Sequence, residues 1–273
     1  MCTLRRKLGR SLAFRSLERL GPRAASKHHG LSSKVVVSLT SYPARYDVLE
    51  KTLVSLLRQN VASDVIVLWL AEDDVASLPK RVRSLVSHGL QIRTCEDIKS
   101  YKKIVPSLSA YPGATIVTAD DDIYYPPRWL ECLVDEARRV PGQIVCHRAH
   151  RVLEDEHGLP LKYAAWNWSV AGGSRGRKLL PTSGAGVLYP GGCLDQRVTD
   201  RESFSALCPT ADDLWLFWMS SVLNSVTVNV VQHPIMPMPW PGTGAGALAI
   251  VNNGQSTGND VQIGRLLNRY GWL

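Results

Sequence analysis

Residues 34–70 read KVVVSLTSYPARYDVLEKTLVSLLRQNVASDVIVLWL, which is the pattern of a strand, a helix and a second strand. Lys34–Leu39 and Asp64–Leu70 are apolar β runs, and Thr40–Pro43 breaks the first of them. Asp47–Gln59 between them carries leucines at helical spacing, which predicts an amphipathic helix. Two buried strands joined by a helix of this length predict a parallel pair in an α/β sheet.

The same alternation continues along the chain. The spacing of apolar residues predicts helices and strands in turn, with two irregular segments. The predicted helices are Leu78–His88, Arg128–Val140 and Leu214–Leu223; the strands are Leu90–Thr94, Ala114–Ala119, Gln143–Arg148 and Val226–Gln232; the irregular segments are Tyr163–Gly176 and Met236–Gly246. These elements predict a single α/β domain with a mostly parallel central sheet and helices on both faces.

Positive charge is concentrated at the amino terminus. The 273 residues carry a net charge of +8, and residues 1–30 hold eight Lys and Arg against one Glu, which leaves +1 for the rest of the chain. A nearly neutral body disfavours a nucleic-acid-binding protein, which needs a basic folded surface. With 45% hydrophobic residues the chain is not disordered. Its apolar runs are far shorter than the roughly 20 residues of a membrane span.

Residues 1–30 are therefore predicted to be a basic arm, flexible or associated with a membrane, ahead of a body of residues 31–273. Three roles remain open for the arm: contact with anionic lipid, an organellar transit peptide, or a solvated tail. The six cysteines show no metal-finger spacing and lie mostly in apolar stretches, so we expect reduced thiols in a cytosolic protein.

Three adjacent carboxylates follow the strand predicted at Ala114–Ala119: Asp120, Asp121 and Asp122. Open α/β sheets bind their ligands at the carboxyl ends of strands. A divalent cation such as Mg²⁺ or Mn²⁺ relieves the repulsion between the acids and can bridge a diphosphate. The alternative is an exposed acidic turn before the next helix.

The end of the first strand offers hydroxyls, backbone amides and a guanidinium beside a helix start, in Thr40, Ser41 and Arg45. This set suits a nucleotide phosphate or base. No glycine-rich dinucleotide motif and no P-loop follows a strand, so those two kinds of site are disfavoured.

Several of these motifs, in order, resemble bacterial glycosyltransferases of the GT-A fold, family-2-like, that build capsular or lipopolysaccharide glycans. The matching segments span residues 34 to 270. They are Val36–Arg45, Lys99–Lys103, Val117–Asp122, Gly184–Pro190, Cys208–Trp215 and Gly258–Asp260. The resemblance implies a GT-A-like fold with a nucleotide-binding half, residues 31–125, and an acceptor half, residues 126–273.

The resemblance also implies roles for individual residues. The acidic triplet corresponds to the DXD motif, with Asp120 and Asp121 at the nucleotide-sugar and Asp122 and Asp120 at the metal. Thr40, Ser41 and Arg45 would line the nucleotide pocket, and Lys102 or Lys103 would reach base or phosphate. Because a leaving nucleoside diphosphate gains negative charge, a metal or lysine beside it is favourable on physical grounds as well.

Asp212 and Asp213 correspond to the acidic motif that supplies the general base of inverting members, with Asp213 preferred. The stretch Thr210–Asp213 also has the pattern of a helix capping box, which is the structural alternative. His233 is a candidate extra metal ligand. Weaker candidates are sugar-stacking tryptophans and diphosphate-binding cations, each with a packing alternative. They are Trp166, Trp168 and Trp240, and Arg175, Arg177 and Lys178.

The sequence therefore predicts a cytoplasmic, metal-dependent glycosyltransferase, with peripheral contact at the inner face of the membrane left open. It would move a sugar from a nucleotide diphosphate donor to a hydroxyl of a glycan or lipid-linked glycan, with inversion. Two alternatives remain: a nucleotidyltransferase acting on a sugar phosphate, and a non-catalytic nucleotide-binding scaffold.

Overall fold

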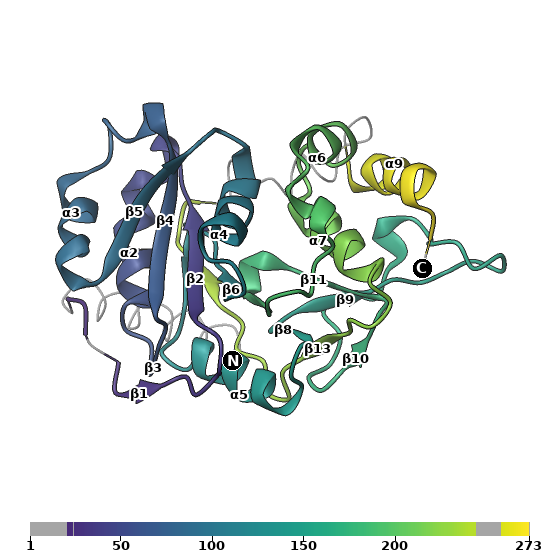
Figure 1. The fold of residues 1–273 in the computed structure, drawn as a ribbon, viewed down its shortest axis with the longest axis horizontal. Coiled ribbons are helices and arrows are strands. Elements are labelled where there is room, and N and C mark those ends of the chain that lie inside the picture. The colour runs from purple at the N-terminus through teal and green to yellow at the C-terminus, as the bar shows by residue number, and fades with distance from the viewer. Residues whose placement is uncertain (1–20, 24, 244–257, 273) are drawn as a thin grey trace, which may run out of the picture.

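A computed structural model describes residues 21–23, 25–243 and 258–272, and these residues form an α/β fold (Figure 1). The central sheet has eight strands in the order β10-β13-β8-β12-β6-β2-β4-β5. The strands are β1 Lys27–His28, β2 Val35–Thr40, β3 Val61–Ala62, β4 Val65–Ala71, β5 Leu90–Cys95, β6 Thr115–Thr118, β7 Ile123–Tyr124, β8 Ile144–Cys146, β9 Ala149–Arg151, β10 Arg175–Gly176, β11 Leu179–Pro181, β12 Val187–Tyr189, β13 Val228–Val230 and β14 Met238–Pro239. The helices are α2 Tyr46–Leu56, α3 Lys80–Arg83, α4 Val105–Ala110, α5 Trp129–Arg139, α6 Arg201–Leu207, α7 Asp212–Ser221 and α9 Asn259–Tyr270.

The amino-terminal half of the sheet is parallel. Strand β2 pairs in parallel with β4 on one side and β6 on the other, and β4 pairs in parallel with β5. Each of these strands was predicted from its apolar run. In the other half, β12 lies antiparallel between β6 and β8, while β8 and β13 are parallel. The predicted α/β class with a mostly parallel sheet is confirmed.

Both faces of the sheet are covered by helices (Figure 1). Because successive side chains of a strand point to opposite faces, Val35, Val37 and Leu39 of β2 pack in one buried cluster with side chains of α2, α3 and α5. Val36 lies in the other cluster, with side chains of α7 and α9. Polar residues of the sheet gather at the carboxyl ends of its strands, between these two buried clusters.

The structure corrects several sequence-based boundaries. The helix predicted over Leu78–His88 is α3 followed by a 3-10 turn at Ser84–His88. Within the two segments predicted to be irregular, short strands form: β10 pairs with β13, and β14 pairs with β7. These pairings join segments distant in sequence, so no local periodicity indicates them. Helices α4, α6 and α9 were not predicted.

The last residues of the predicted basic arm contact the body. Strand β1 pairs in parallel with β3, and Nζ of Lys27 lies 2.7 Å from a carboxylate oxygen of Glu131. Residues 1–20, which carry most of the arm's charge, lie outside the described residues. In the part that is described, no helix is long and apolar enough to cross a membrane. Five of the cysteines are described, and all five are free thiols, as predicted. They are Cys95, Cys132, Cys146, Cys193 and Cys208.

Candidate functional site

A cleft of about 880 Å³ opens at the carboxyl ends of β2, β5 and β6. Its walls come from both halves of the chain. The polar residues that line it include Thr40, Ser41, Arg45, Asp97, Ser100, Lys102, Lys103, Asp120, Asp121, Asp122, Arg148, His150, Thr182, Ser183, Asp212, Asp213 and Asn259. The structure thus brings every predicted catalytic and nucleotide-binding residue into one cleft, although their positions in the sequence span more than 170 residues.

The three acids after β6 each bind a different partner. Oδ1 of Asp120 accepts from Nζ of Lys103 at 2.9 Å, and Oδ2 of Asp122 accepts from Nη1 of Arg45 at 2.7 Å. Oδ2 of Asp121 accepts from Oγ of Ser41 at 2.5 Å. The triplet is therefore not a freely solvated turn.

Burial and crowding of like charges perturb these acids. Burial raises the pKa of Asp121 to about 7, against the hydrogen bond from Ser41, and the charges of Asp122 and Asp120 raise it further. Burial likewise raises the pKa of Asp122, with the charge of Asp120 adding to it. A dication held between Asp120 and Asp122 would relieve this repulsion, and hard carboxylate oxygens are suitable ligands for it. The donor chemistry of these two carboxylates suits Mg²⁺ or Mn²⁺, but each is already paired with a cation of the protein, Lys103 or Arg45.

The residues predicted to line a nucleotide pocket are held by hydrogen bonds to neighbouring elements. The hydroxyl of Thr40 donates to the carbonyl oxygen of Trp69 in β4 at 2.9 Å. Arg45 donates from Nη1 to the carbonyl oxygen of Thr243 at 2.8 Å, in addition to its bond to Asp122. Both side chains line the cleft, but each is already partly engaged within the protein.

Lys103 joins the two acidic groups of the cleft. Its side chain is buried, and Nζ lies 2.9 Å from Oδ1 of Asp120 and 3.1 Å from Oδ2 of Asp212. Burial opposes its charge, but the two carboxylates raise the pKa of Lys103 well above its ordinary value, so it is a cation. Lys102, also buried, donates to Asp97 at 2.6 Å. Both lysines are anchored by acids of the protein itself.

The acids at the start of α7 do not cap that helix. Its N-cap residue is Ala211, without a side-chain capping bond, so the capping-box alternative is wrong. The amides of Thr210 and Ala211 instead donate to Oε1 of Gln262 in α9, both at 3.2 Å. The carboxylates of Asp212 and Asp213 instead contact Lys103 and Ser183, respectively.

Asp213 is held by one residue of the opposite wall. Its Oδ1 accepts from the backbone amide of Ser183 at 3.1 Å and from its hydroxyl at 2.5 Å. Burial raises the pKa of Asp213 to about 6, and the charge of Asp212 adds to the rise, while Lys103 and Ser183 oppose it. A fixed carboxylate with a pKa near 6 can accept a proton at neutral pH.

His233 is not brought into this site. It is exposed and does not line the cleft. Of the weaker candidates, only Trp168 lines the cleft, half-exposed. Trp166 and Trp240 are buried, and their indole nitrogens donate to Leu161 and Thr52.

The cation candidates next to β10 also lie outside the cleft. Arg177 donates to the side chain of Asn224 at 2.6 Å. Lys178 lies 2.6 Å from a carboxylate oxygen of Glu154, and Arg175 is exposed. None of the three lines the cleft.

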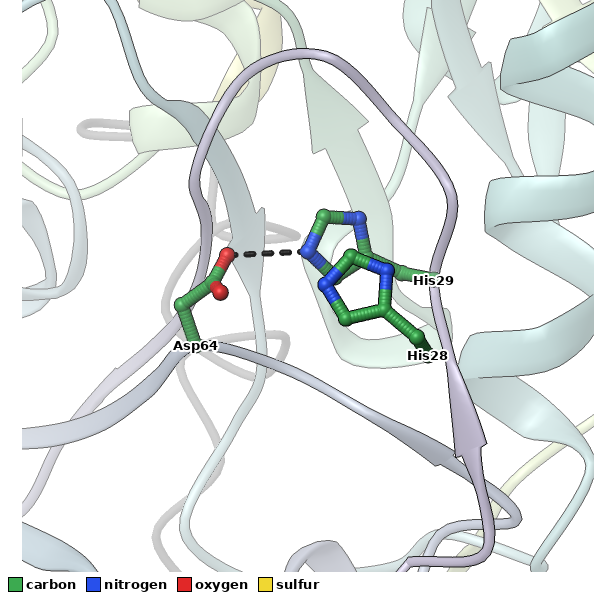
Figure 2. A group of neighbouring side chains, drawn as sticks. All are labelled: His28, His29 and Asp64. Carbon is green, nitrogen blue, oxygen red and sulfur yellow. Dashed lines mark hydrogen bonds and ion pairs between the residues drawn. The ribbon is translucent and has the colours of Figure 1, made fainter.

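One group with metal-ligating side chains lies elsewhere among the described residues: His28, His29 and Asp64 (Figure 2). Nδ1 of His29 accepts the amide of Leu31 at 3.1 Å, so Nε2 carries the proton and donates to Asp64 at 2.9 Å. Oδ2 of Asp64 also accepts the amide of Val35 at 2.7 Å. Both ring nitrogens of His29 are therefore hydrogen-bonded. The His29–Asp64 bond ties the end of the arm to the body, and we call this pair the latch.

Among the cleft residues that sequence reasoning missed are Arg148, His150, Ser183 and Asn259. Arg148 ends the strand predicted at Gln143–Arg148 and His150 follows two residues later, an alternation that could have placed them on one face. No local pattern indicates Ser183, which reaches the cleft through tertiary packing; Asn259 lies in the matching segment Gly258–Asp260, but no role was predicted for it.

No protein-family model matches the chain, and no curated protein matches its sequence. Among solved structures, it is partly similar to a mannosyltransferase from Pyrobaculum calidifontis in complex with GDP-Man and Mn²⁺, at 13% identity over 53% of this chain and 43% of that chain, with a TM-score of 0.35. A second is glucosyl-3-phosphoglycerate synthase from Mycobacterium tuberculosis in complex with Mn²⁺ and UDP-Glc, at 18% identity over 42% and 43%, with a TM-score of 0.33.

Another partial match is 4-diphosphocytidyl-2C-methyl-D-erythritol synthase from Anaerococcus prevotii, at 15% identity over 75% of this chain and 90% of that chain, with a TM-score of 0.45. The chain spans less than half the length of the two glycosyl-transferring enzymes it matches. At these identities and TM-scores the matches identify neither a substrate nor a reaction for this chain.

Proposed function

We propose that the protein is a metal-dependent glycosyltransferase that moves a sugar from a nucleoside diphosphate donor to a hydroxyl of a glycan acceptor, with inversion. The observation that carries the proposal is the pairing of two acidic groups across one cleft. Asp120–Asp122 lie at the sheet edge, Asp213 lies at the start of α7, and Lys103 bridges them through Asp120 and Asp212.

The donor side of the cleft suits a nucleoside diphosphate. Asp120 and Asp122 would hold a divalent cation, which supplies positive charge for the departing diphosphate. Arg45 lies beside Asp122 and contributes a second cation there. Ser100 lines the same wall, and its buried Oγ has no hydrogen-bond partner within the described residues, so it is available to a bound ligand.

On the acceptor side, Asp213 is the general base. Its carboxylate takes the proton of the acceptor hydroxyl as that oxygen attacks the anomeric carbon and the bond to the diphosphate breaks. Ser183 fixes the carboxylate through two hydrogen bonds, so the base need not reorient during the reaction. Direct attack from the face opposite the leaving group inverts the anomeric configuration.

The reaction products test this proposal. Incubation with a panel of nucleotide sugars, Mn²⁺ and glycan acceptors should release nucleoside diphosphate. Release of pyrophosphate from a nucleoside triphosphate and a sugar phosphate would instead identify a nucleotidyltransferase. Asp213→Asn and Asp122→Ala should each abolish transfer in a folded preparation, and undiminished transfer in both would overturn the assignment. Nucleotide binding with no product of either kind would indicate a scaffold.

A further inference from the structure

One wall of the cleft is a two-stranded ribbon built from β9 and β11. The strands are antiparallel, with Leu180 opposite His150, and the amide of Thr182 donates to the carbonyl oxygen of Arg148 at 3.1 Å. Arg148 and His150 are two residues apart in extended chain and so project to the same face. Both line the cleft.

Arg148 is a half-buried cation without an acidic partner. Its Nε donates to Oγ1 of Thr182 at 2.6 Å, which fixes the direction of the guanidinium. The other buried or half-buried cations of the cleft, Arg45, Lys102 and Lys103, each have a carboxylate within 4 Å. Within residues 21–23, 25–243 and 258–272, no carboxylate lies that close to Arg148. A guanidinium held this way in a partly dry cleft favours an anionic ligand.

His150 adds a second, neutral donor. Its Nδ1 accepts the amide of Ser169 at 3.0 Å, so the proton of the neutral ring sits on Nε2. Burial lowers the pKa of His150 to about 4, with the charge of Arg148 adding to the effect. The ring lies 4.6 Å from that of Trp168, which is half-exposed at the cleft. Two donors therefore lie beside an aromatic surface of the kind on which sugar rings pack.

This wall lies close to the proposed base. Burial raises the pKa of Tyr163 to about 12; the nearby charge of Asp213 raises it further, and that of Arg148 lowers it. A Cβ placed on Gly184, the residue after Ser183, would lie 3.8 Å from Nη2 of Arg148 and 2.9 Å from Oδ2 of Asp120, so Arg148 lies near the acids after β6 as well as near Ser183. Asn259 also lines the cleft; its buried Oδ1 has no hydrogen-bond partner in the described part of the chain and can accept from a hydroxyl.

We propose that the acceptor is a sugar bearing an anionic group, a phosphate or a carboxylate, which binds Arg148 and Nε2 of His150. Trp168 packs against the sugar ring, and one hydroxyl then reaches Asp213. This inference rests on the proposed function, because it assigns the acceptor of the same reaction. The competing assignment is that Arg148 binds the diphosphate of the donor.

Calorimetric binding to the full chain, without donor, tests the acceptor assignment directly. Glucose 6-phosphate and glucuronate should each bind at least about tenfold more tightly than glucose. Arg148→Gln should remove this advantage, while Arg175→Gln, an exposed arginine outside the cleft, should leave it intact. If only one of the two anionic sugars binds tightly, the group is identified as phosphate or carboxylate. Equal binding of all three sugars to the wild type would overturn the inference.

Two further measurements separate the possible outcomes. Binding of UDP or GDP with Mn²⁺ should be unchanged in Arg148→Gln; if that binding is lost and sugar-phosphate binding is kept, Arg148 belongs to the donor and the inference is overturned. An NMR titration of the His150 ring should show its pKa rising when glucose 6-phosphate binds, and no rise would contradict the contact. If Arg148→Gln does not fold, Arg148→Lys, which keeps the positive charge, replaces it in these measurements. Failure of the wild type to bind any nucleoside diphosphate would contradict the proposed function. The sugar-binding result does not depend on that outcome.

Discussion

Nη1 of Arg45 lies 2.7 Å from Oδ2 of Asp122, so the carboxylate expected to bind metal is already paired with a cation of the protein. A divalent ion must compete with Arg45 for that oxygen. Removing the guanidinium in Arg45→Gln should therefore raise the affinity for Mn²⁺ alone several-fold, while weakening nucleoside diphosphate binding about tenfold through loss of a charged donor. Calorimetry with Mn²⁺ and then with UDP or GDP measures both effects.

A matched control for Arg45 is Arg81→Gln. Arg81 is half-exposed, lies 3.2 Å from Glu50 and does not line the cleft, so both affinities should stay at the wild-type level. Asp122→Asn should lose Mn²⁺ binding. If Arg45→Gln weakens Mn²⁺ binding as Asp122→Asn does, Arg45 does not compete with the metal.

The pKa of Asp213 sets the expected pH dependence of transfer. A base with a pKa of about 6 is protonated below that pH, so the rate should fall on the acid side with an apparent pKa near 6. Ser183→Ala removes a hydrogen bond that lowers this pKa, and the acid limb should move to higher pH. Asp212→Asn removes a charge that raises it, and the limb should move to lower pH. If the acid limb moved in the same direction in Ser183→Ala and Asp212→Asn, the assignment of Asp213 as the base would be contradicted.

The same pKa predicts a gain in stability from loss of the base. Because the pKa of Asp213 is higher in the folded state than its ordinary 3.8, ionising the carboxyl costs stability as the pH rises from about 4 to 6. Asp213→Asn should therefore raise the free energy of unfolding at pH 8 by about 3 kcal/mol, or roughly 6–12 °C in Tm. Transfer should fall by roughly 100- to 10,000-fold. Differential scanning calorimetry at pH 8 and at pH 4 measures the difference, which should vanish at the lower pH.

Half of the fold and the donor side of the site follow from local sequence. The strands β2, β4 and β6 consist mostly of apolar and β-branched residues, and α2 has leucines at helical spacing, so their type is predictable. The acids Asp120–Asp122 come directly after such a run, which places them at the sheet edge. The carboxyl-half elements are different: β9, β11 and β12 have three residues each, too few to show a period.

The acceptor side was harder to predict because its geometry depends on contacts between distant segments. Arg148 is oriented by Thr182, and Asp213 is held by Ser183. The backbone amides just before α7 donate to the side chain of Gln262, roughly fifty residues further on. The predicted capping box does not form, because a side chain of another helix accepts these hydrogen bonds. Tertiary packing determines which hydrogen-bond partner a buried polar group has, and a local sequence pattern does not indicate that partner.

Gly184 offers a steric test of the donor side. A Cβ at this position would lie 2.9 Å from Oδ2 of Asp120, closer than a carbon and an oxygen can approach without movement. Gly184→Ala should displace the Asp120 carboxylate and reduce Mn²⁺-dependent transfer by about tenfold or more. Gly264→Ala is the control, because its Cβ would meet nothing within 4 Å and α9 should keep or gain stability. Equal activity of the two variants would show that transfer does not depend on the position of the Asp120 carboxylate.

The latch formed by His29 and Asp64 locates the boundary of the basic arm. Deleting residues 1–20 leaves β1, the Lys27–Glu131 ion pair and the latch in place. This truncation should keep transfer to a soluble acceptor and should weaken binding to anionic vesicles, by roughly 1 kcal/mol for each Lys or Arg removed from the surface. Deleting residues 1–30 also removes Lys27 and His29, which contact Glu131 and Asp64, and should lower the Tm. Vesicle sedimentation and thermal unfolding of the two truncations measure these effects. Loss of soluble-acceptor activity in the shorter deletion, or equal Tm values for both, would show that the division between arm and body is misplaced.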